Sequence, residues 1–247
     1  MMIGGRAHNV RDVQLIGEAG LPFAEISIRD KDEFYTDLHA LKKLRDTHGL
    51  MYLAHGPEEK NPWEPDILRK EFLPRIQFLI DCSLELTIPL FTIHFWLDSR
   101  FLERAVIDEK IVILNSMATY AADKGVQLCL ENLSERADDF SPVFDRIGAL
   151  GMTLDVGHGE LLSEENTAHA FCRDCFSRIN HIHLHDNRGG DSPEDDLHLP
   201  LGRGQIDFFS ILSAFKQKGY DKTMTLEIRP QYLFSGKEII EDIWGRS

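Results

Sequence analysis

The chain has 247 residues, of which 43% are hydrophobic and 28% are charged, a balance that is typical of a folded globular protein and excludes a disordered one. Aspartate and glutamate number 41 against 27 lysines and arginines, so the formal net charge is −14 at pH 7. A surface this acidic repels phosphate backbones and acidic membrane faces, and we expect neither nucleic acid nor a membrane as a partner.

The sequence also lacks the usual signals for secretion and membrane insertion. Residues 1–6 do not have the apolar segment of a signal peptide. The longest apolar stretch, residues 86–97, is interrupted by Pro89 and His94 and is much shorter than the roughly 20 residues of a membrane helix. The four cysteines are too scattered for a disulfide framework. We therefore expect a soluble cytoplasmic protein.

Short apolar runs alternate with longer amphipathic stretches along the whole chain. The predicted strands are residues 2–4, 23–28, 51–55, 91–94, 127–131, 152–155, 179–183 and 223–227. The predicted helices are residues 10–19, 34–48, 67–86, 104–124, 143–150, 164–176, 208–218 and 237–244. Strict alternation favours a parallel sheet with helical crossovers, and eight repeats in about 250 residues favour closure. The sequence therefore predicts one (β/α)₈ TIM-barrel domain over residues 1–247.

Residues that start and stop helices support this assignment. Lys124-Gly125 and Lys218-Gly219 place a cation and then a glycine at predicted helix ends. Ser141-Pro142 and Asp207-Phe208 place an oxygen-bearing side chain where a helix is expected to begin.

Polar residues recur where the predicted strands end, or shortly after them. They are His55, His94, Glu131, Asp155, His158, His183, Asp196, His198 and Glu227. The carboxyl ends of parallel barrel strands open on one face, which is where the active sites of this fold lie. Mixed imidazole and carboxylate ligands suit zinc, manganese, iron or cobalt. We therefore predict a site for a divalent metal, zinc or manganese, with one to three ions.

Each of these residues also has a simpler structural interpretation. A single histidine is more often a core or loop residue than a ligand, and a glutamate at a strand end can pair with a residue such as Arg229. His181, His183 and His185 share one face of their strand, so spacing alone does not choose among them. The remaining histidines lie on predicted helices or loops away from the mouth, and we expect them on the surface: His8, His39, His48 and His169.

Other residues are candidates for substrate binding or for a purely structural role. Arg188 follows the seventh strand and could steer an anionic or hydroxylated substrate, or lie on the surface. Trp63 and Trp96 could form the wall of a sugar pocket, or shield a loop. The stretch 202–204, Gly-Arg-Gly, could bind a phosphate on its backbone amides or form a plain loop. The pair Cys172 and Cys175 is best interpreted as buried thiols.

Several motifs resemble a known superfamily. They are LENL at 130–133, LDVGHG at 154–159, HIHLHDN at 181–187, DLHLPLGRGQIDF at 196–208 and TLE at 225–227. In these stretches the chain resembles the xylose-isomerase-like barrels, which include sugar phosphate isomerases and epimerases as well as endonuclease IV. The resemblance covers nearly the whole chain and is not specific for one activity.

The epimerase branch of this superfamily implies one metal ion, bound by Glu131, Asp155, His183 and Glu227. By this resemblance the two glutamates also move protons on either face of the substrate carbon, and His158 contacts the substrate. The metal would polarise a carbonyl and stabilise an enediolate, with Glu131 and Glu227 as base and acid.

The endonuclease branch instead implies three zinc ions and a hydroxide that attacks phosphorus. All nine of its ligand positions have the matching residue type here: His55, His94, Glu131, Asp155, His158, His183, Asp196, His198 and Glu227. The surrounding motifs differ. Residues 133–136 replace a glycine-rich run, Gly157 replaces a cysteine or serine, and the acidic residues 191–195 replace a basic stretch.

The leading hypothesis is a metal-dependent isomerase or epimerase that acts on a small sugar or sugar phosphate. The alternative is a multinuclear zinc phosphoesterase of the endonuclease IV type, and a second alternative is a barrel that binds a ligand without catalysis. Metal content per chain separates the first two. The sequence leaves open whether the chain forms a homo-oligomer.

Overall fold

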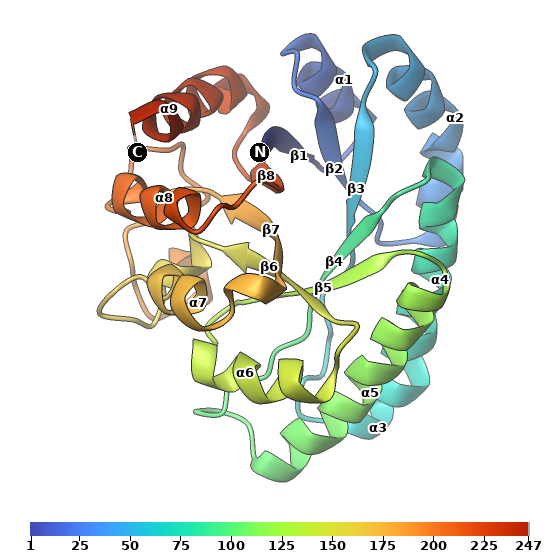
Figure 1. The fold of residues 1–247 in the computed structure, drawn as a ribbon. Helices are drawn as coiled ribbons and strands as arrows, with labels where there is room; N and C mark the ends of the chain where they lie inside the picture. The colour runs from blue at the N-terminus through green and yellow to red at the C-terminus, as the bar shows by residue number, and fades with distance from the viewer. Residues whose placement is uncertain (247) are drawn as a thin grey trace.

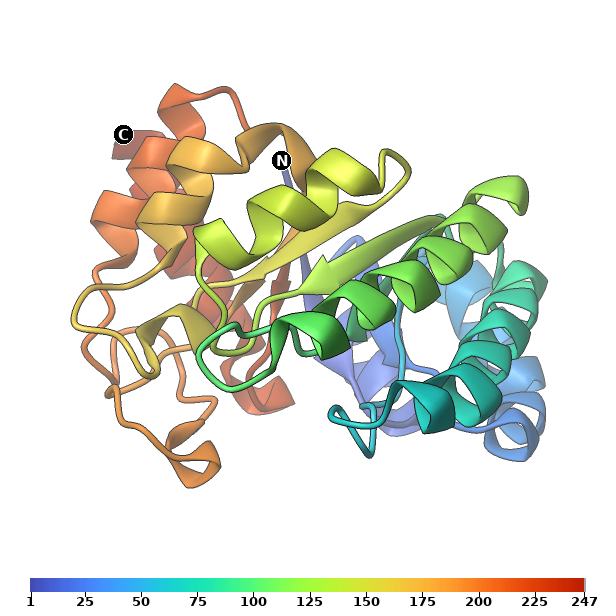
Figure 2. The same cartoon turned by 90° about the horizontal axis from the view of Figure 1, so that it is seen from below.

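The computed structural model describes residues 1–246 and forms a closed barrel of parallel strands with helices around it (Figures 1 and 2). The strands are β1 Met2–Ala7, β2 Phe23–Ser27, β3 Met51–His55, β4 Leu90–His94, β5 Gln127–Glu131, β6 Gly151–Asp155, β7 Ile179–Leu184 and β8 Thr223–Leu226. Each pairs with its neighbour in chain order, and Met2 of β1 lies beside Thr223 of β8. The predicted (β/α)₈ barrel is confirmed.

The crossovers between strands are helical. The α-helices are α1 Val10–Glu18, α2 Lys31–His48, α3 Pro65–Ile67, α4 Leu73–Ser83, α5 Arg104–Asp123, α6 Ala137–Arg146, α7 Ala168–Asp174, α8 Phe208–Gln217 and α9 Leu233–Arg246. Shorter turns are η1 Leu68–Phe72, η2 Leu84–Leu86, η3 His158–Glu160, η4 Phe176–Arg178, η5 Pro193–Asp195 and η6 Pro230–Tyr232. The expected start at Asp207 is confirmed, because its side chain accepts a hydrogen bond from the Ser210 amide.

Two helical predictions were wrong. Ser141-Pro142 does not begin a helix: Pro142 lies inside α6, which starts earlier, where the Asp139 side chain accepts a hydrogen bond from the Arg136 amide. The continuous helix predicted for residues 67–86 is divided, because a π-helical turn over Leu68–Phe72 separates α3 from α4.

Most of the core lies between the strands and the surrounding helices. A second, small apolar cluster consists of Phe23, Leu53, Leu90 and Cys129, which come from β2 to β5. Gly4 of β1 makes room for it, because a Cβ at this position would lie 2.4 Å from the Phe23 ring. The Phe23 ring also meets His181 edge to face, with ring centroids 6.1 Å apart. Through the contact between Phe23 and His181, this apolar cluster packs against the polar residues inside the barrel.

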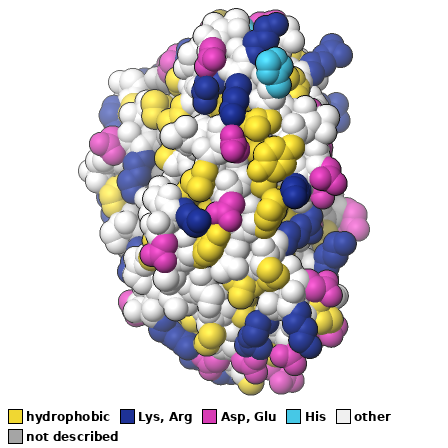
Figure 3. Space-filling model, turned by 90° about the vertical axis from the view of Figure 1, so that its right-hand side faces the viewer, with side chains coloured by type: hydrophobic (Ala, Val, Ile, Leu, Met, Phe, Trp, Pro, Cys, Tyr) yellow, Lys and Arg dark blue, Asp and Glu magenta, His cyan; other side chains and the backbone are white. Residues whose placement is uncertain are grey.

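The outer surface over α2, α4 and α5 carries charges of both signs, with hydrophobic side chains gathered between them (Figure 3). Exposed hydrophobic residues on these helices include Tyr35, Phe78 and Val112. The acidic surplus is therefore not spread as a uniform negative surface. No helix in the described part of the chain is long and apolar enough to cross a lipid bilayer.

Candidate metal centre

The predicted ligand residues converge at the carboxyl ends of the strands. His55, His94, Glu131 and Asp155 are the last residues of β3, β4, β5 and β6. The other predicted residues come from β7, from the residue after β8 and from the loops: His183, Glu227, His158, Asp196 and His198. Most are buried, and His198 is the most exposed, with 40% of its side chain accessible.

The first group of ligand atoms is centred on His183 Nδ1. This atom lies 3.1 Å from Glu131 Oε1, 3.5 Å from Glu227 Oε1 and 3.7 Å from Asp155 Oδ2. One ligand atom from each of these residues lies within 4.8 Å of all the others. Asp155 Oδ2 is buried and has no hydrogen-bond partner. A buried, unpaired carboxylate oxygen is costly, and a divalent cation at this position would compensate it, so the residues fit a metal.

Opposing effects set the charge of the two glutamates in this group. Burial raises the pKa of Glu131, but the charges of His183 and His94 and hydrogen bonds from His183 and His55 outweigh it, so the pKa lies well below its ordinary value. Burial likewise raises the pKa of Glu227, while His183 and Arg6 bring it below the ordinary value. Both side chains are therefore carboxylates near neutral pH, which is the form that binds a metal or removes a proton.

A second group shares Glu131 with the first. Oε2 of Glu131 lies 2.9 Å from His55 Nε2 and 3.1 Å from His94 Nε2. The Nδ1 of His55 is 2.9 Å from the carbonyl oxygen of Gly56, which fixes the ring with Nε2 toward the glutamate. Glu131 therefore has one oxygen in each group, as a carboxylate between two cations would.

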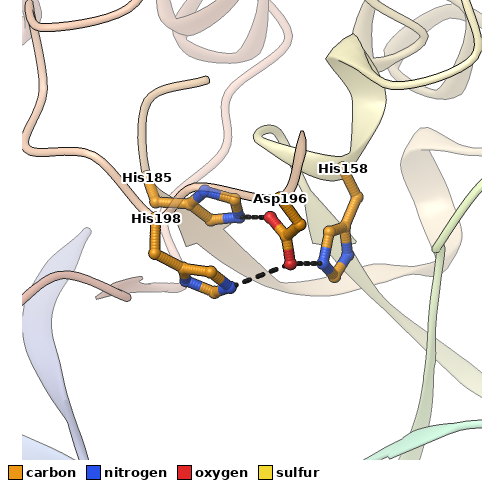
Figure 4. A group of neighbouring side chains, drawn as sticks. All are labelled: His158, His185, Asp196 and His198. Carbon is orange, nitrogen blue, oxygen red and sulfur yellow. Dashed lines mark hydrogen bonds and ion pairs between the residues drawn. The ribbon is translucent and has the colours of Figure 1, made fainter. Parts of the chain in front are cut away.

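The third group is arranged around Asp196 (Figure 4). Asp196 Oδ2 lies 3.1 Å from His198 Nε2 and 3.3 Å from His158 Nε2, while Oδ1 lies 3.8 Å from His185 Nε2. His198 Nδ1 is 3.0 Å from the carbonyl oxygen of Glu227, which orients its Nε2 toward the aspartate. Burial lowers the pKa of His198, but its hydrogen bond to Asp196 and the charges of nearby acids raise the pKa to about 9.

Two residues of the centre were missed in the sequence. His185 was left undecided among three neighbouring histidines, yet it belongs to the third group, and its Nε2 also lies 3.1 Å from Asp155 Oδ1. Glu25 of β2 was not recognised at all. It is fully buried, and its carboxylate lies 2.9 and 3.1 Å from His183 Nε2 and 3.2 Å from His181 Nε2. The available signal was a lone carboxylate inside an apolar strand.

Two cavities open beside the ligand groups. The aromatic cavity, of about 430 Å³, is lined by Trp63, Trp96, Leu133, Leu161 and Pro193 as well as by His94 and His158. Trp63 and Trp96 meet edge to face with ring centroids 5.9 Å apart. The structure thus places both tryptophans at the mouth, beside the predicted ligands.

The basic cavity, of about 680 Å³, is lined by Arg6, His8, Arg29, Lys60 and Arg75 together with metal-ligand candidates. His8 is exposed, as predicted, but its expected place away from the mouth was wrong: it follows β1 and lines this cavity.

Other candidate substrate contacts lie outside these cavities. Arg188 is exposed and lines neither of them, so its role stays a prediction. In the stretch 202–204, the Gly204 amide donates to Asp186 Oδ2 at 2.7 Å, so the chain itself supplies the anion and the stretch is a structural loop. Cys172 and Cys175 are free and buried, as predicted.

A family model described as "Xylose isomerase-like TIM barrel" matches residues 13–243. The chain belongs to the xylose isomerase-like TIM barrel family.

Relatives within and around this family have diverged widely in sequence. An uncharacterized protein of Methanocaldococcus jannaschii is 26% identical, over 76% of this chain and 67% of that protein. An inosose isomerase of Halalkalibacterium halodurans is 23% identical, over 94% of this chain and 87% of that protein.

Solved structures share the barrel at similarly low identity. A D-tagatose 3-epimerase-like protein is 23% identical with a TM-score of 0.85, over 100% of this chain and 98% of that chain. The IOLI protein, solved with a bound zinc atom, is 16% identical with a TM-score of 0.77, over 100% of this chain and 99% of that chain. These likenesses extend the fold assignment to both ends of the described chain.

Gly157 is one point at which this family member departs from the endonuclease pattern. A Cβ at this position would lie 2.0 Å from Cε1 of His185. The glycine therefore makes room for the His185 ring, which stacks on His198 with centroids 3.9 Å apart. Gly157 thus allows His185 to take its place in the third group.

Proposed function

We propose that this protein is a metal-dependent isomerase or epimerase of a small sugar or sugar phosphate. The observation that carries the proposal is the position of Glu131 and Glu227, whose Oε1 atoms lie 3.1 and 3.5 Å from the same nitrogen of His183. They come from β5 and from the end of β8, so they approach that point from different strands of the barrel. Inosose isomerase and the epimerase structures among the neighbours support the same class of reaction.

The residues divide into a binding set and a proton-transfer set. Glu131, Asp155, His183 and Glu227 would hold one divalent metal, with zinc or manganese as the natural choices for such ligands. The bound metal would supply a Lewis acid that polarises the carbonyl of the substrate. One of Glu131 and Glu227 would remove the proton on the neighbouring carbon, and the other would return one.

The surrounding side chains would position the reacting groups. Arg6 Nε lies 3.0 Å from Glu227 Oε1, which restricts this carboxylate and keeps it ionised. Trp63 and Trp96 would form the apolar wall against which a sugar packs. His158 lines both cavities and would contact the substrate hydroxyls.

The test is a panel of ketoses, inososes and their phosphate esters, incubated with zinc- or manganese-loaded protein in heavy water. We expect one compound to be converted, with deuterium on the carbon next to its carbonyl. Conversion without any solvent deuterium would rule out direct exchange through the two glutamates. No conversion across the panel, with metal bound, would count against the isomerase class.

A second candidate is a multinuclear zinc phosphoesterase, favoured by one specific observation. The three ligand groups described above coexist, and Glu131 belongs to two of them. The acidic segment beside the aromatic cavity, which includes Asp191 and Asp196, speaks against a nucleic acid as its substrate. Hydrolysis of a phosphodiester by the zinc-loaded protein, with no sugar converted, would favour this candidate.

A further inference from the structure

The basic cavity combines positive charge with direct access to the candidate metal centre. Its wall carries Arg6, Arg29, Lys60 and Arg75, and it also reaches Glu227 and His158. In a chain with a net charge of −14, such a concentration of cations in one cavity runs against the overall charge of the protein. These cations therefore need an explanation other than the average composition of the surface.

Three of the four acidic side chains of this cavity, Glu59, Asp196 and Glu227, already have partners. Glu59 is hydrogen-bonded to Lys110 Nζ at 2.8 Å and to the Trp96 amide at 2.7 Å. Glu227 pairs with Arg6, and Asp196 interacts with histidines of the third group. Glu58 is the remaining acid on the wall.

The cations on the outer part of the wall are not neutralised in the same way. Among residues 1–246, Arg29, Lys60 and Arg75 form no ion pair within 4.0 Å. Arg75 Nη2 donates to the carbonyl oxygen of Arg29 at 2.6 Å, which brings a residue of α4 to the segment after β2. His8 lies beside these cations: burial is the main cause that lowers its pKa, and the charges of Arg6 and Arg29 lower it further, against Glu227 and Asp12, which raise it.

We propose that Arg29 and Arg75, assisted by Lys60, bind an anionic group at one end of the substrate. The group is a phosphate ester or a carboxylate, since the guanidinium fork matches the oxygen geometry of both. This proposal rests on the proposed function and narrows it to an anionic sugar. The substrate would extend from the aromatic cavity, past the metal ligands, into the basic cavity, because the two cavities share His94, His158 and Asp196.

The first test measures binding without requiring turnover. Inorganic phosphate and gluconate are titrated into metal-free protein by calorimetry, with the native chain compared with the double variant Arg29→Gln/Arg75→Gln. The matched control is Arg69→Gln/Arg104→Gln, which removes the same charge from exposed residues that line neither cavity. We expect the double variant to bind the anion at least 10-fold more weakly and the control to bind like the native chain.

The two probes distinguish the two sources of the anionic group. A loss confined to phosphate assigns a phosphate ester, and a loss confined to gluconate assigns a sugar acid. Equal binding by native, double-variant and control proteins would overturn the subsite. The single variant Arg29→Gln, which keeps the contact from Arg75 to the Arg29 backbone, guards against misfolding of the double variant.

The second test separates this subsite from the proposed function. Once a substrate is known, the double variant should raise KM at least 10-fold and change kcat by less than about 3-fold. If no sugar reacts, the isomerase proposal is rejected. If the double variant still loses anion binding in that case, the anion subsite is retained. A short DNA duplex serves as a further probe. If the native protein binds it with sub-micromolar affinity and the double variant does not, the proposal that the cavity binds a small anionic substrate is overturned.

Discussion

Glu25 contacts His183 on the side of the ring opposite Glu131. The Nε2 atom of His183 lies 2.9 Å from Glu25 Oε2, while Nδ1 lies 3.1 Å from Glu131 Oε1. When the proton of the neutral imidazole is on Nε2, Nε2 donates a hydrogen bond to Glu25. The lone pair of Nδ1 then faces the first ligand group. A carboxylate behind a metal-binding histidine fixes its tautomer and orientation and makes it a stronger ligand.

Replacing Glu25 by glutamine should therefore weaken metal binding without removing a ligand. Loss of such a partner typically costs about 10- to 100-fold in metal affinity. We expect this loss for Glu25→Gln in a zinc competition assay with a chromogenic chelator, together with an altered visible spectrum of the cobalt-loaded protein. The control Glu238→Gln changes an exposed glutamate of α9 and should leave both unchanged. Native affinity and an unchanged cobalt spectrum in Glu25→Gln would refute the role.

The two glutamates of the first group should be needed for proton transfer. Glu131→Gln and Glu227→Gln keep the shape of the side chain but remove the base, so turnover should fall by roughly 10²–10⁴. Solvent deuterium should no longer enter the substrate in either variant. Metal content is measured in parallel, because a variant that loses the ion would lose activity for a different reason. Unimpaired deuterium exchange in both variants would exclude these residues as the acid and base.

Metal content should report how many of the ligand groups are used. If the second group binds an ion, zinc-saturated protein should contain more than one zinc per chain, and His55→Ala should lower the count by one. The first group does not include His55 and should keep its ion. Elemental analysis after gel filtration gives both numbers. A single ion per chain that His55→Ala leaves in place would remove the support for the phosphoesterase.

Glu135 should make stability depend on pH near neutrality. It accepts hydrogen bonds from the Leu97 and Leu133 amides, and burial raises its pKa to about 7. A carboxyl group with a raised pKa in the folded state favours folding while it is protonated, and this contribution is lost as the pH rises through about 7. From pH 5 to pH 8 the loss should be about 2 kcal/mol.

The measurement compares denaturant unfolding of metal-free native protein and Glu135→Gln at several pH values. The variant has no proton to lose at this position, whereas all other titrating groups are common to both proteins. The difference in unfolding free energy, native minus variant, should therefore fall between pH 5 and pH 8. A difference that is constant, or that rises with pH, would show that Glu135 is ionised throughout.

Local patterns predicted the barrel well, because β3, β4, β5 and β6 each end at the polar residue that marks the end of the predicted strand. Strands β3 and β5 have the predicted bounds, 51–55 and 127–131. The start of α6 was mistaken because Pro142 was taken as a first-turn residue, whereas the capping contact lies between Arg136 and Asp139. A local oxygen-proline pattern does not distinguish these two cases.

The remaining parts of the site depend on contacts between distant segments. The role of Glu25 becomes visible only when the barrel closes and the side chains of Glu25 on β2 and His183 on β7 come within hydrogen-bond distance of each other. Arg29 and Arg75 meet because α4 packs near the segment that follows β2. His185 can be placed in the third group only once Gly157 is seen to leave space for its ring. Sequence spacing within one segment does not contain this information.

The pairing of β1 with β8 has a consequence for how the protein is made. Glu25 leaves the ribosome early, but Glu227 lies after β8 and follows almost all of the barrel. Domains are synthesised from the amino terminus at about 5–20 residues per second, so Glu25 waits for at least about ten seconds before Glu227 is available. A nascent chain can present histidine pairs to stray metal ions during this interval, but it assembles the complete first group only after the ring closes. If the proposed metal site is used, its ion can therefore be chosen only after synthesis, when β8 joins β1 and Glu227 is in place.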